Sequence, residues 1–376
     1  MSTASTAPVA GLDAARLQIS KTSSPKPKLA PESLVFGKSF TDHMLAIEWT
    51  AEHGWAAPQI KPYGPLMLDP ASVVFHYAFE CFEGMKAYRN KADEIRLFRP
   101  DKNMARLNAS AERICLPQFD SEELIKLISE FVKLDKDWIP TDRGYSLYLR
   151  PTLIGTQPAL GVGAPQNALL YVIASPVGPY YPTGFKAVRL EATDYAVRAW
   201  PGGAGNRKLG ANYAPCIKAQ REAASRGYQQ NLWLFGPEGN ITEAGTMNAF
   251  FVFKTPEGKR ELVTAPLDGT ILEGVTRDSI LELARTRLDQ NQWIISERYC
   301  TIAEVKAAAE RGDLVEAFGA GTAAVVSPIK EIGWKEAAIF VPLQEGKECG
   351  ELTEKVAEWI GDIQYGKDVH PWSALI

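Results

Sequence analysis

The sequence predicts a two-domain chain of mixed α/β and α+β structure. At 376 residues it is long for one core, since a domain usually holds about 100–200 residues. Segments with strand-like and helix-like hydrophobic spacing alternate along nearly the whole chain. Between the halves, "GPYYPTG" at 178–184 combines glycine and proline as linkers do. We expect a smaller α/β domain over 33–177, a linker over 178–188 and a larger domain over 189–376.

Residues 1–32 are predicted to form a disordered N-terminal tail. They are rich in Ser, Thr, Ala and Pro, and Asp13 is the only acid before Glu32. A mitochondrial transit peptide has a similar composition, but it would normally carry more arginine than the single Arg16.

The first half begins with strands and then adds two helices. "MKAYRNKADEIRLFRP" predicts two strands joined by a polar turn at 90–93. Apolar residues from Met104 to Ile114 recur every three or four positions, which indicates a helix. "DSEELIKLISEFVKLDKDW" predicts another helix, capped by Asp120 with Glu123. "YSLYLRPTLIG" and "ALLYVIASPVG" follow as β-rich runs.

The second half alternates more regularly. A helix is expected from about Ala214 to Gly227, where glycine favours a stop. Two "PEG" turns separate β-rich runs, and "LVEAFGAGTAAVVSPI" reads as strand, glycine loop and strand. Three further segments are predicted to be helical, namely "VTRDSILELARTRLDQN", "IAEVKAAAERGD" and "GELTEKVAEWIGDIQYG".

Composition excludes several classes of protein. The net charge of −4 argues against a nucleic-acid or membrane surface, and no apolar run approaches the roughly 20 residues that span a bilayer. The five cysteines are far apart without a CxxC, so neither a disulfide framework nor a metal site is expected. A reducing compartment, the cytoplasm, fits best, with the mitochondrion as the alternative. The four histidines lack the partners that a hydrolase or metalloenzyme needs.

Two glycine-containing segments are candidates for phosphate binding. "GAGTAA" at 319–324 matches a dinucleotide pattern, but that pattern should open a helix, whereas a strand is expected here. "EGVTRDSIL" places Gly274 and Thr276 at a helix start, where free amides favour an anion. Simple capping of this helix by Thr276 is the alternative. Thr322 offers a hydroxyl in the other loop.

Lys208 stands in an unusually thin stretch of backbone, "GGAGNRKLG". With a phosphate site and an acid, such an amine could hold pyridoxal phosphate, the lysine forming the Schiff base and the acid keeping the ring nitrogen protonated. Glu243 in "NITEAGTMN" is the candidate acid, and the glycines would let the flat cofactor lie against the backbone. Taken singly, the two residues are better explained as a surface loop lysine and a hairpin acid, and only their joint occurrence favours a cofactor site.

In "SLYLR", strand alternation places Ser146, Tyr148 and Arg150 on one face. A phenol beside a guanidinium suits a carboxylate, which arginine can bind through two hydrogen bonds. An exposed strand face is the alternative explanation.

Together these motifs closely resemble those of the branched-chain amino acid aminotransferases, a family of two-domain, fold type IV pyridoxal-phosphate enzymes with the cofactor at the domain interface. The resemblance extends from about residue 33 to the C-terminal region. It is carried by "LVFGKSFTDHML", "FHYAFECFEGMKAYR", "RLFRPDKNMARL", "SLYLRPTLIG", "AWPGGAGNRKLGANYAP", "GNITEAGTMNAFFV", "LEGVTRDSILELA" and "EAFGAGTAAVVSPI".

The resemblance implies a role for each matching residue. Lys208 would be the catalytic Schiff-base lysine that also moves the proton, Tyr213 would bind the cofactor's phenolic oxygen, and Glu243 its ring nitrogen. Phosphate binding is implied for Arg106, Val275, Thr276 and Thr322, with Arg198 close by. Substrate binding is implied for Thr246 and the amide of Ala323 at the α-carboxylate, for Phe36, Tyr77, Phe82, Tyr148 and Tyr180 around the side chain, and for Arg150 with Tyr148 at the second carboxylate of glutamate.

The implied reaction transfers the amino group of leucine, isoleucine or valine to 2-oxoglutarate, with pyridoxal 5'-phosphate as cofactor, in a homodimer that binds neither nucleic acid nor membrane. A fold type IV transaminase acting on aromatic or non-standard branched amino acids, D-amino acids or (R)-amines is the alternative. A binding protein on the same scaffold is disfavoured by the retention of Lys208, Tyr213 and Glu243.

Overall fold

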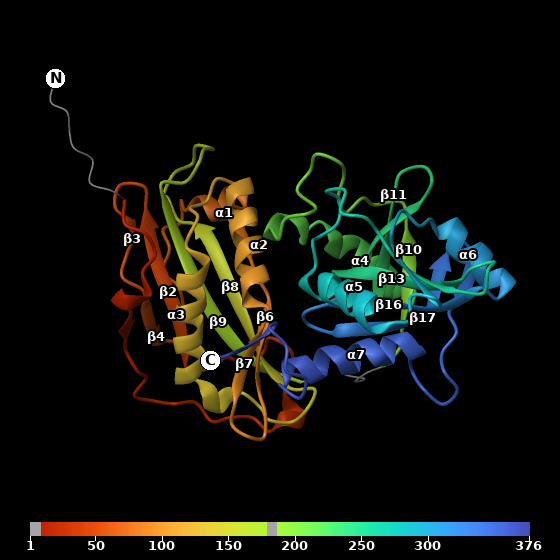
Figure 1. The fold of residues 1–376 in the computed structure, drawn as a ribbon. Helices are drawn as coiled ribbons and strands as arrows, with labels where there is room; N and C mark the ends of the chain where they lie inside the picture. The colour runs from red at the N-terminus through yellow and green to blue at the C-terminus, as the bar shows by residue number, and fades with distance from the viewer. Residues whose placement is uncertain (1–8, 179–185) are drawn as a thin grey trace. The chain divides into compact units, whose positions relative to one another are not determined.

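The structure, a computed structural model, describes residues 9–178 and 186–376 (Figure 1). The chain divides into two compact units, which are described separately. Unit 1 comprises Met1–Gly178, Lys208–Gly210 and Trp372–Ile376, and unit 2 comprises Pro179–Arg207 and Ala211–Pro371. Most of the predicted linker, 179–185, lies outside the described residues.

The division differs from the predicted domains in two short segments. The sequence assigns both Lys208–Gly210 and Trp372–Ile376 to the larger domain, whereas both belong to unit 1. The reason is strand pairing, because Leu209 forms a bridge with Cys81 and the C-terminal residues add an edge strand to the sheet of unit 1.

Unit 1 is built on a ten-stranded sheet with the order β1-β4-β2-β9-β8-β6-β7-β19, with β3 beside β2 and β5 beside β8. Only the β1–β4 pairing is parallel among these. The strands are β1 (Gln18–Ile19), β2 (His43–Thr50), β3 (Gly54–Trp55), β4 (Gln59–Pro62), β5 (Glu80–Phe82), β6 (Met85–Arg89), β7 (Ile95–Phe98), β8 (Ser146–Gly155), β9 (Asn167–Val177) and β19 (Ser373–Leu375).

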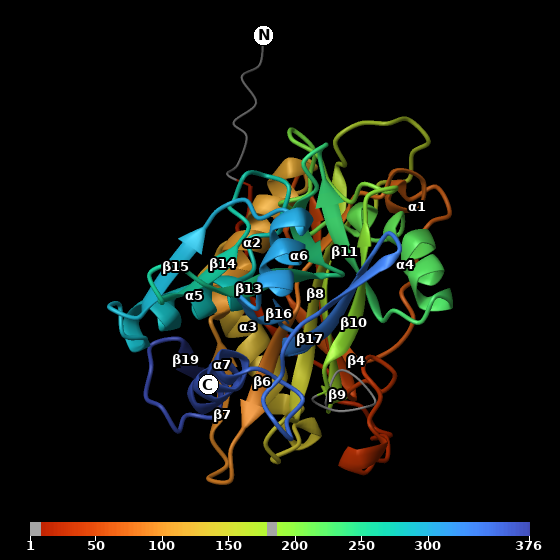
Figure 2. The same cartoon turned by 90° about the vertical axis from the view of Figure 1, so that its right-hand side faces the viewer.

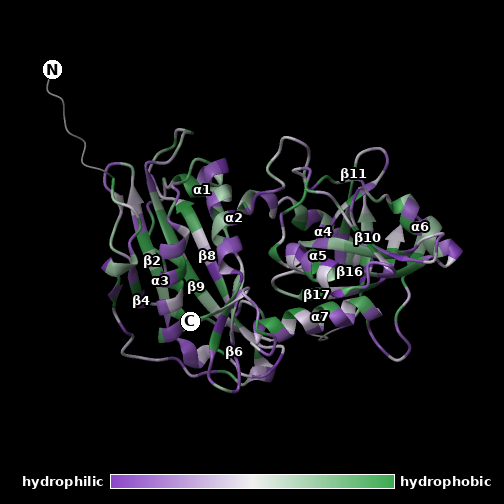
Figure 3. Cartoon of the chain, viewed as in Figure 1, coloured by the Kyte–Doolittle hydropathy of each residue, from purple (hydrophilic) through white to green (hydrophobic). Residues whose placement is uncertain are grey.

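The helices of unit 1 confirm the predicted pattern. Asp120 caps α3 (Ser121–Leu134) by accepting the amides of Glu122 and Glu123 at 2.8 and 3.2 Å, as the capping signal indicates. α2 (Pro100–Arg113) packs against α3, and both lie along the sheet (Figure 1). The remaining helical elements are α1 (Val73–Tyr77), η1 (Ala14–Arg16), η2 (Pro31–Ser33) and η3 (Lys136–Trp138). In Figure 3 the central strands are mainly hydrophobic, whereas α3 carries many hydrophilic residues.

Residues 9–32 differ from the predicted disordered tail, since they are held on unit 1. Thr22 N donates to His43 Nε2 at 3.0 Å, and Lys26 Nζ donates to the Thr41 carbonyl at 2.6 Å. Ala14 N donates to the Glu123 carboxylate at 2.6 Å. These contacts join residues distant in sequence and are mostly polar, so local hydrophobic periodicity gave no sign of them.

Unit 2 contains a nine-stranded sheet in the order β12-β11-β10-β17-β16-β13-β14-β15, with β18 beside β17. An additional β12–β13 pairing closes six of these strands into a ring. The strands are β10 (Val188–Thr193), β11 (Gln230–Phe235), β12 (Asn240–Ala244), β13 (Met247–Lys254), β14 (Arg260–Thr264), β15 (Trp293–Glu297), β16 (Leu314–Gly321), β17 (Val325–Trp334) and β18 (Ala337–Phe340).

The helices of unit 2 cover this sheet. α4 packs on β10 and β11, α6 packs on β16 and β18, and α5 and α7 contact each other and β16 (Figure 2). The expected helices and the strand–loop–strand at 314–334 are thereby confirmed. None of the helices in residues 9–178 and 186–376 has both the length and the apolar character needed to span a bilayer. The bounds are α4 (Cys216–Ser225), α5 (Val275–Arg287), α6 (Ile302–Arg311) and α7 (Glu351–Gln364). The short η4 (Gly210–Asn212) starts at Gly210 of unit 1, and its other two residues belong to unit 2.

Candidate active site

Lys208 is fixed at both backbone groups by unit 1. Phe82 N donates to the Lys208 carbonyl at 3.0 Å, and Lys208 N donates to Ser110 Oγ at 2.9 Å. Gly210 N donates to the carboxylate of Glu80, which lies in the same short strand as Phe82. The segment that carries the candidate catalytic amine is thus paired along β5 and anchored to α2, which defines where its side chain starts.

An aromatic ring and charged groups lie around the Lys208 amine. The amine lies 4.9 Å from the centre of the Phe82 ring, and the Arg150 guanidinium carbon lies 4.6 Å from the same ring. Burial raises the pKa of the Glu80 carboxyl, against the Gly210 hydrogen bond and the positive charges of Arg150 and Lys208, which lower it. Glu80 was not predicted from the sequence, although strand alternation places it on the same face of β5 as Phe82.

The predicted pair Tyr148 and Arg150 does share one face of β8. Arg150 Nη2 donates to Tyr148 Oη at 3.0 Å, and the Phe36 ring meets the Tyr148 ring edge-on at 4.9 Å. Gly84 is required beside this pair, because a Cβ there would meet the Tyr148 hydroxyl. Four of the predicted substrate residues, Phe36, Phe82, Tyr148 and Arg150, are therefore brought together.

Two other residues that are predicted to surround the substrate side chain, Tyr77 and Tyr180, are not placed in this group. The hydroxyl of Tyr77 donates to the Leu160 carbonyl, and the side chain is exposed. Tyr180 lies outside the described residues. Their predicted contact with substrate stays a prediction.

Arg106, predicted to bind phosphate, lies on α2 one turn before Ser110. Its Nε and Nη2 donate to the two carboxylate oxygens of Glu83 at 2.6 and 2.9 Å. The Glu83 side chain is fully buried and that of Arg106 is 9% exposed. The guanidinium is therefore held in one plane by a carboxylate that was not predicted from the sequence.

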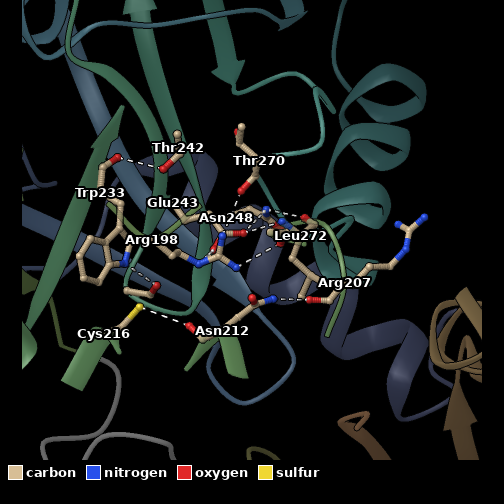
Figure 4. Close-up of polar contacts among 12 residues, drawn as sticks. Arg198, Arg207, Asn212, Cys216, Trp233, Thr242, Glu243, Asn248, Thr270 and Leu272 are labelled. Atoms are coloured by element: carbon tan, nitrogen blue, oxygen red, sulfur yellow. Dashed lines mark hydrogen bonds and ion pairs between the residues drawn. The ribbon is translucent and has the colours of Figure 1, made fainter. Parts of the chain in front are cut away.

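In unit 2, Glu243 is the centre of a buried polar network (Figure 4). Its Oε1 accepts the Leu272 amide at 2.8 Å, and its Oε2 forms an ion pair with Arg198 Nε at 2.8 Å. Asn248 Nδ2 lies 3.5 Å from Oε1 and donates to the Leu272 carbonyl at 2.9 Å. These donors favour the ionised carboxylate, which is the form that can hold a protonated ring nitrogen.

Arg198 contacts Glu243 and two carbonyls. Its Nη1 donates to the Thr270 carbonyl at 3.0 Å and its Nη2 donates to the Gly205 carbonyl at 3.3 Å. The resemblance places Arg198 near the phosphate, and that proximity stays a prediction. Its direct contacts instead connect Glu243 to the glycine-rich loop before Lys208 (Figure 4).

The glycines around Lys208 serve chain packing. A Cβ at Gly205 would lie 2.6 Å from the Thr270 carbonyl oxygen, and a Cβ at Gly210 would meet the Glu80 carboxylate. The thin backbone was expected to admit a flat cofactor. At these two positions it admits other parts of the protein instead.

Tyr213, the predicted partner of the cofactor's phenolic oxygen, directly follows η4 and is half-buried. The preceding Asn212 donates through Nδ2 to the carbonyls of Ala204 and Arg207 at 2.8 and 2.9 Å. Asn212 thereby fixes the loop at 204–207, which directly precedes Lys208 in the chain. Asn212 itself directly precedes Tyr213. This bracing residue was not predicted from the sequence.

The N-cap residue of α5 offers no side chain to the amides of the first turn, because it is Gly274. Thr276 lies inside the first turn and not at the N-cap position, so it is not the capping residue. Val275 and Thr276 are buried in the first turn. A Cβ at Gly274 would meet the side-chain oxygen of Asn248, so this turn lies against the Glu243 network.

The turns carrying Thr246, Thr322 and Ala323 lie at one end of the unit 2 sheet. β13 begins just after Thr246 and pairs antiparallel with β16, which ends just before Thr322. Trp233 Nε1 donates to the Gly245 carbonyl at 2.9 Å and so anchors the first turn (Figure 4). Unit 2 thus gathers the predicted carboxylate, phosphate and ring-nitrogen groups at one end.

The residues present fit pyridoxal phosphate. A half-buried lysine has its backbone fixed, a buried carboxylate contacts the Leu272 amide and Arg198, and a helix start without a side-chain cap can offer amides to an anion.

Known proteins match the chain over most of its length. A family model, amino-transferase class IV, matches residues 80–332. Two branched-chain-amino-acid aminotransferases of Saccharomyces cerevisiae are similar to it. The mitochondrial enzyme is 66% identical over 98% of this chain and 94% of its own length, and the cytosolic enzyme is 65% identical over 98% of each.

A solved structure is also similar. The T.th. branched-chain amino acid aminotransferase complexed with N-(5'-phosphopyridoxyl)-L-glutamate is 26% identical, covers 87% of this chain and 97% of its own, and has a TM-score of 0.65. The ligand in that neighbour joins the cofactor skeleton to glutamate. Taken with the lysine, carboxylate and helix-start geometry, these matches show that the chain belongs to the class IV aminotransferases, among the branched-chain-amino-acid aminotransferases.

Proposed function

We propose that the chain transfers the amino group of leucine, isoleucine or valine to 2-oxoglutarate with pyridoxal 5'-phosphate on Lys208. The observation that carries this assignment is the fixed backbone of Lys208 beside Phe82 and Arg150. It supplies an amine, an apolar ring and a cation within one unit. An amino-acid donor with an apolar side chain and an acceptor with a carboxylate need these groups.

When bound, the cofactor withdraws electrons from the substrate α-carbon, so that its proton can leave. Lys208 takes that proton at Nζ and returns it in the second half of the step, acting first as base and then as acid. Glu243 keeps a proton at the ring nitrogen, since Arg198 and the Leu272 amide hold its carboxylate ionised.

The remaining residues bind and orient. Arg106 and the first turn of α5 at Val275 and Thr276 hold the phosphate, with Thr322. Thr246 and the amide of Ala323 hold the substrate α-carboxylate, and Tyr213 holds the phenolic oxygen. The positions of Val275 and Thr276 at a helix start and of Thr246, Thr322 and Ala323 at turns support the assignment, because backbone and hydroxyl donors concentrate there.

One side-chain pocket must accept both an isobutyl group and a carboxylate. Phe36, Phe82 and Tyr148 offer apolar contact to the former. Arg150, hydrogen-bonded to the Tyr148 hydroxyl at 3.0 Å, offers two donors to the latter. Arg150→Met should therefore weaken the reaction with glutamate about 100-fold and that with leucine by less than about threefold, and equal losses would place the second carboxylate elsewhere.

The visible spectrum of the purified protein tests the proposal directly. The cofactor band should disappear when L-leucine is added and return when 2-oxoglutarate follows. A band that leucine leaves unchanged would assign the chain to another donor among the fold type IV transaminases. Absence of a band after addition of pyridoxal phosphate would remove Lys208 from its role.

We also propose that the active form is a homodimer. Large apolar side chains are exposed on α1 and on two loops of unit 1, which touch through a hydrogen bond from the Ala159 amide to the Ala71 carbonyl at 3.0 Å. A light-scattering mass equal to one chain would contradict the dimer. The exposed residues include Met67, Phe75, Leu160 and Val162.

For location, we propose the cytoplasm, with the mitochondrion as the alternative. The two yeast relatives are named for one compartment each, and they match the chain almost equally. A fluorescent fusion at the C-terminus, viewed beside a mitochondrial dye, distinguishes the two.

A further inference from the structure

Glu83 is a fully buried carboxylate to which the proposed reaction gives no task. A buried charge is strongly unfavourable unless it is paired and hydrogen-bonded. A carboxylate in such a position therefore needs an explanation, either in the stability of unit 1 or in the placement of another group.

The contacts of Glu83 converge on α2. Its oxygens accept Arg106 Nε at 2.6 Å and Nη2 at 2.9 Å, and Oε2 also accepts Asn103 Nδ2 at 2.8 Å. Gly84 N lies 3.1 Å from Oε2. Asn103 Nδ2 lies 3.2 Å from the Gly84 carbonyl as well, so the carboxamide is itself held in place.

This geometry fixes the Arg106 guanidinium in a plane. Glu83 engages the edge formed by Nε and Nη2, and a guanidinium can grip a second oxyanion through the edge formed by its two terminal nitrogens. The orientation of that second edge is determined by the Glu83 contact, because the group is planar and rigid.

The pair is also placed beside the Lys208 anchor. Asn103, Arg106 and Ser110 are spaced by three and four residues, so they share one face of α2. Ser110 Oγ accepts the Lys208 amide at 2.9 Å. The Glu83–Arg106 pair therefore lies one helical turn from the residue that fixes the candidate catalytic lysine.

We propose that Glu83, held by Asn103, is the positioning residue for Arg106 and presets its guanidinium for the phosphate of the cofactor. The inference rests on the proposed phosphate role of Arg106. Removing the Glu83 charge would by itself strengthen anion binding, because Arg106 would lose its neutralising partner. Positioning and simple electrostatics therefore predict opposite signs for the same variant.

The test compares two cofactor forms on the full-length protein freed of cofactor. Dissociation constants of pyridoxal phosphate and of pyridoxal, which lacks the phosphate, are measured by absorbance for wild type and Glu83→Gln. The side chain of glutamine has one acceptor oxygen where glutamate has two, so it cannot reproduce the two parallel hydrogen bonds from Arg106 to separate oxygens. We expect pyridoxal phosphate to bind about 10-fold more weakly and pyridoxal to bind within about twofold of wild type, the size of effect seen when partners that orient binding residues are removed.

Three further variants complete the design. Arg106→Gln should lose affinity for pyridoxal phosphate alone and by more than Glu83→Gln. Asn103→Ala, which keeps the ion pair but removes one donor to Glu83, should give a smaller loss of the same kind and serves if Glu83→Gln fails to fold. Asp135→Asn is the matched control, since Asp135 is a buried carboxylate of the same unit paired with His43 Nδ1 at 2.6 Å. It should leave the ratio of the two constants unchanged.

The outcomes separate the inference from the function it rests on. If Arg106→Gln selectively loses pyridoxal phosphate while Glu83→Gln and Asn103→Ala bind it as tightly as wild type or more tightly, Glu83 does not position Arg106. Equal weakening of both cofactor forms by Glu83→Gln would show a general structural role and also overturn the inference. If Arg106→Gln shows no selectivity for the phosphate, the phosphate role of Arg106 fails, and the inference fails with it.

Discussion

Each of the two units contains a buried arginine–glutamate pair. The pairs differ in whether the arginine or the glutamate is the member proposed to contact the cofactor. In unit 1 the pair is Arg106 with Glu83, and the arginine is the group proposed to meet the cofactor. In unit 2 the pair is Arg198 with Glu243, and the glutamate has that place. The same ion pair can therefore present a fixed cation or a fixed anion.

The partners of each pair show how this difference arises. Glu83 takes its further hydrogen bonds from Asn103 and Gly84, so the carboxylate is the anchored member. Arg198 donates to two carbonyls at 3.0 and 3.3 Å, so there the guanidinium is anchored to the loops around it. In each pair the anchored member has further hydrogen bonds and so helps to position its partner. Glu243 differs from Arg106 in that the Leu272 amide also holds it directly, at 2.8 Å.

The largest effect is expected from Glu243→Gln. An amide cannot hold a proton on the ring nitrogen, so the single-turnover rate with leucine should fall by at least about 100-fold, a loss of the size seen when a key charged group is removed. Affinity for pyridoxal phosphate should change by less than about threefold, because the phosphate contacts remain. Stopped-flow absorbance and equilibrium binding measure the two. A loss of affinity without loss of rate would mean that Glu243, like Arg106, acts in cofactor binding, and the proposed difference between the two pairs would be wrong.

The stability cost of breaking a pair should be next. Arg198→Met leaves Glu243 buried without its cation and should lower the free energy of unfolding by about 3–5 kcal/mol. The double variant Arg198→Met with Glu243→Leu should cost clearly less than the sum of the single changes. Urea unfolding at one protein concentration checks both. As a control, Lys133→Ala removes an exposed ion pair on α3 and should cost about 0–1 kcal/mol. Additive losses would mean that the two side chains are not coupled.

A moderate effect is expected from Asn248→Ala. The side-chain amide donates to the Leu272 carbonyl at 2.9 Å and lies 3.5 Å from Glu243. Its removal leaves a buried carbonyl unsatisfied, which costs about 1–3 kcal/mol of stability. The rate with leucine should fall by about 10-fold or less, because Arg198 and the Leu272 amide still hold Glu243. A fall as large as that of Glu243→Gln would make Asn248 the principal support.

The smallest effect concerns Glu80, a half-buried carboxylate whose burial outweighs the positive charges near it. Its pKa in the folded protein is raised, so the ionised form is less favoured in the fold than in the unfolded chain. That destabilisation is absent at pH values below the ordinary pKa and grows as pH rises through the folded value. Glu80→Gln should therefore gain stability relative to wild type as pH rises above the ordinary glutamate pKa of about 4, as measured by urea unfolding without cofactor. A relative loss over that range would mean that the nearby cations dominate.

Sequence reasoning found the candidate members of these networks but not their supports. Lys208, Glu243 and Arg150 stand in local contexts with distinct composition or alternation. Glu83 and Asn248 are supported by contacts that span 23 and 24 residues, and no local pattern encodes such pairings. The helix caps and strand alternation succeeded because their physics is local.

The predicted tail and domain limits differed for the same reason. Thr22 reaches His43 across 21 positions, and β19 reaches β7 from the far end of the chain. Hydrophobic periodicity reports which face of an element is buried, but not which distant segment covers it. Single hydrogen bonds between loops produce no periodic pattern in the sequence.

The pairing of β19 with β7 makes unit 1 discontinuous, since its final strand, Ser373–Leu375, follows the entire chain of unit 2. Its lysine-bearing segment, Lys208–Gly210, is likewise supplied from within that chain. During synthesis from the N-terminus, unit 1 therefore lacks the candidate catalytic amine until residues 208–210 have been made, and one edge of its sheet until residues 373–375 have been made. The unit whose first strands are made first is thus the later of the two to receive all of its strands.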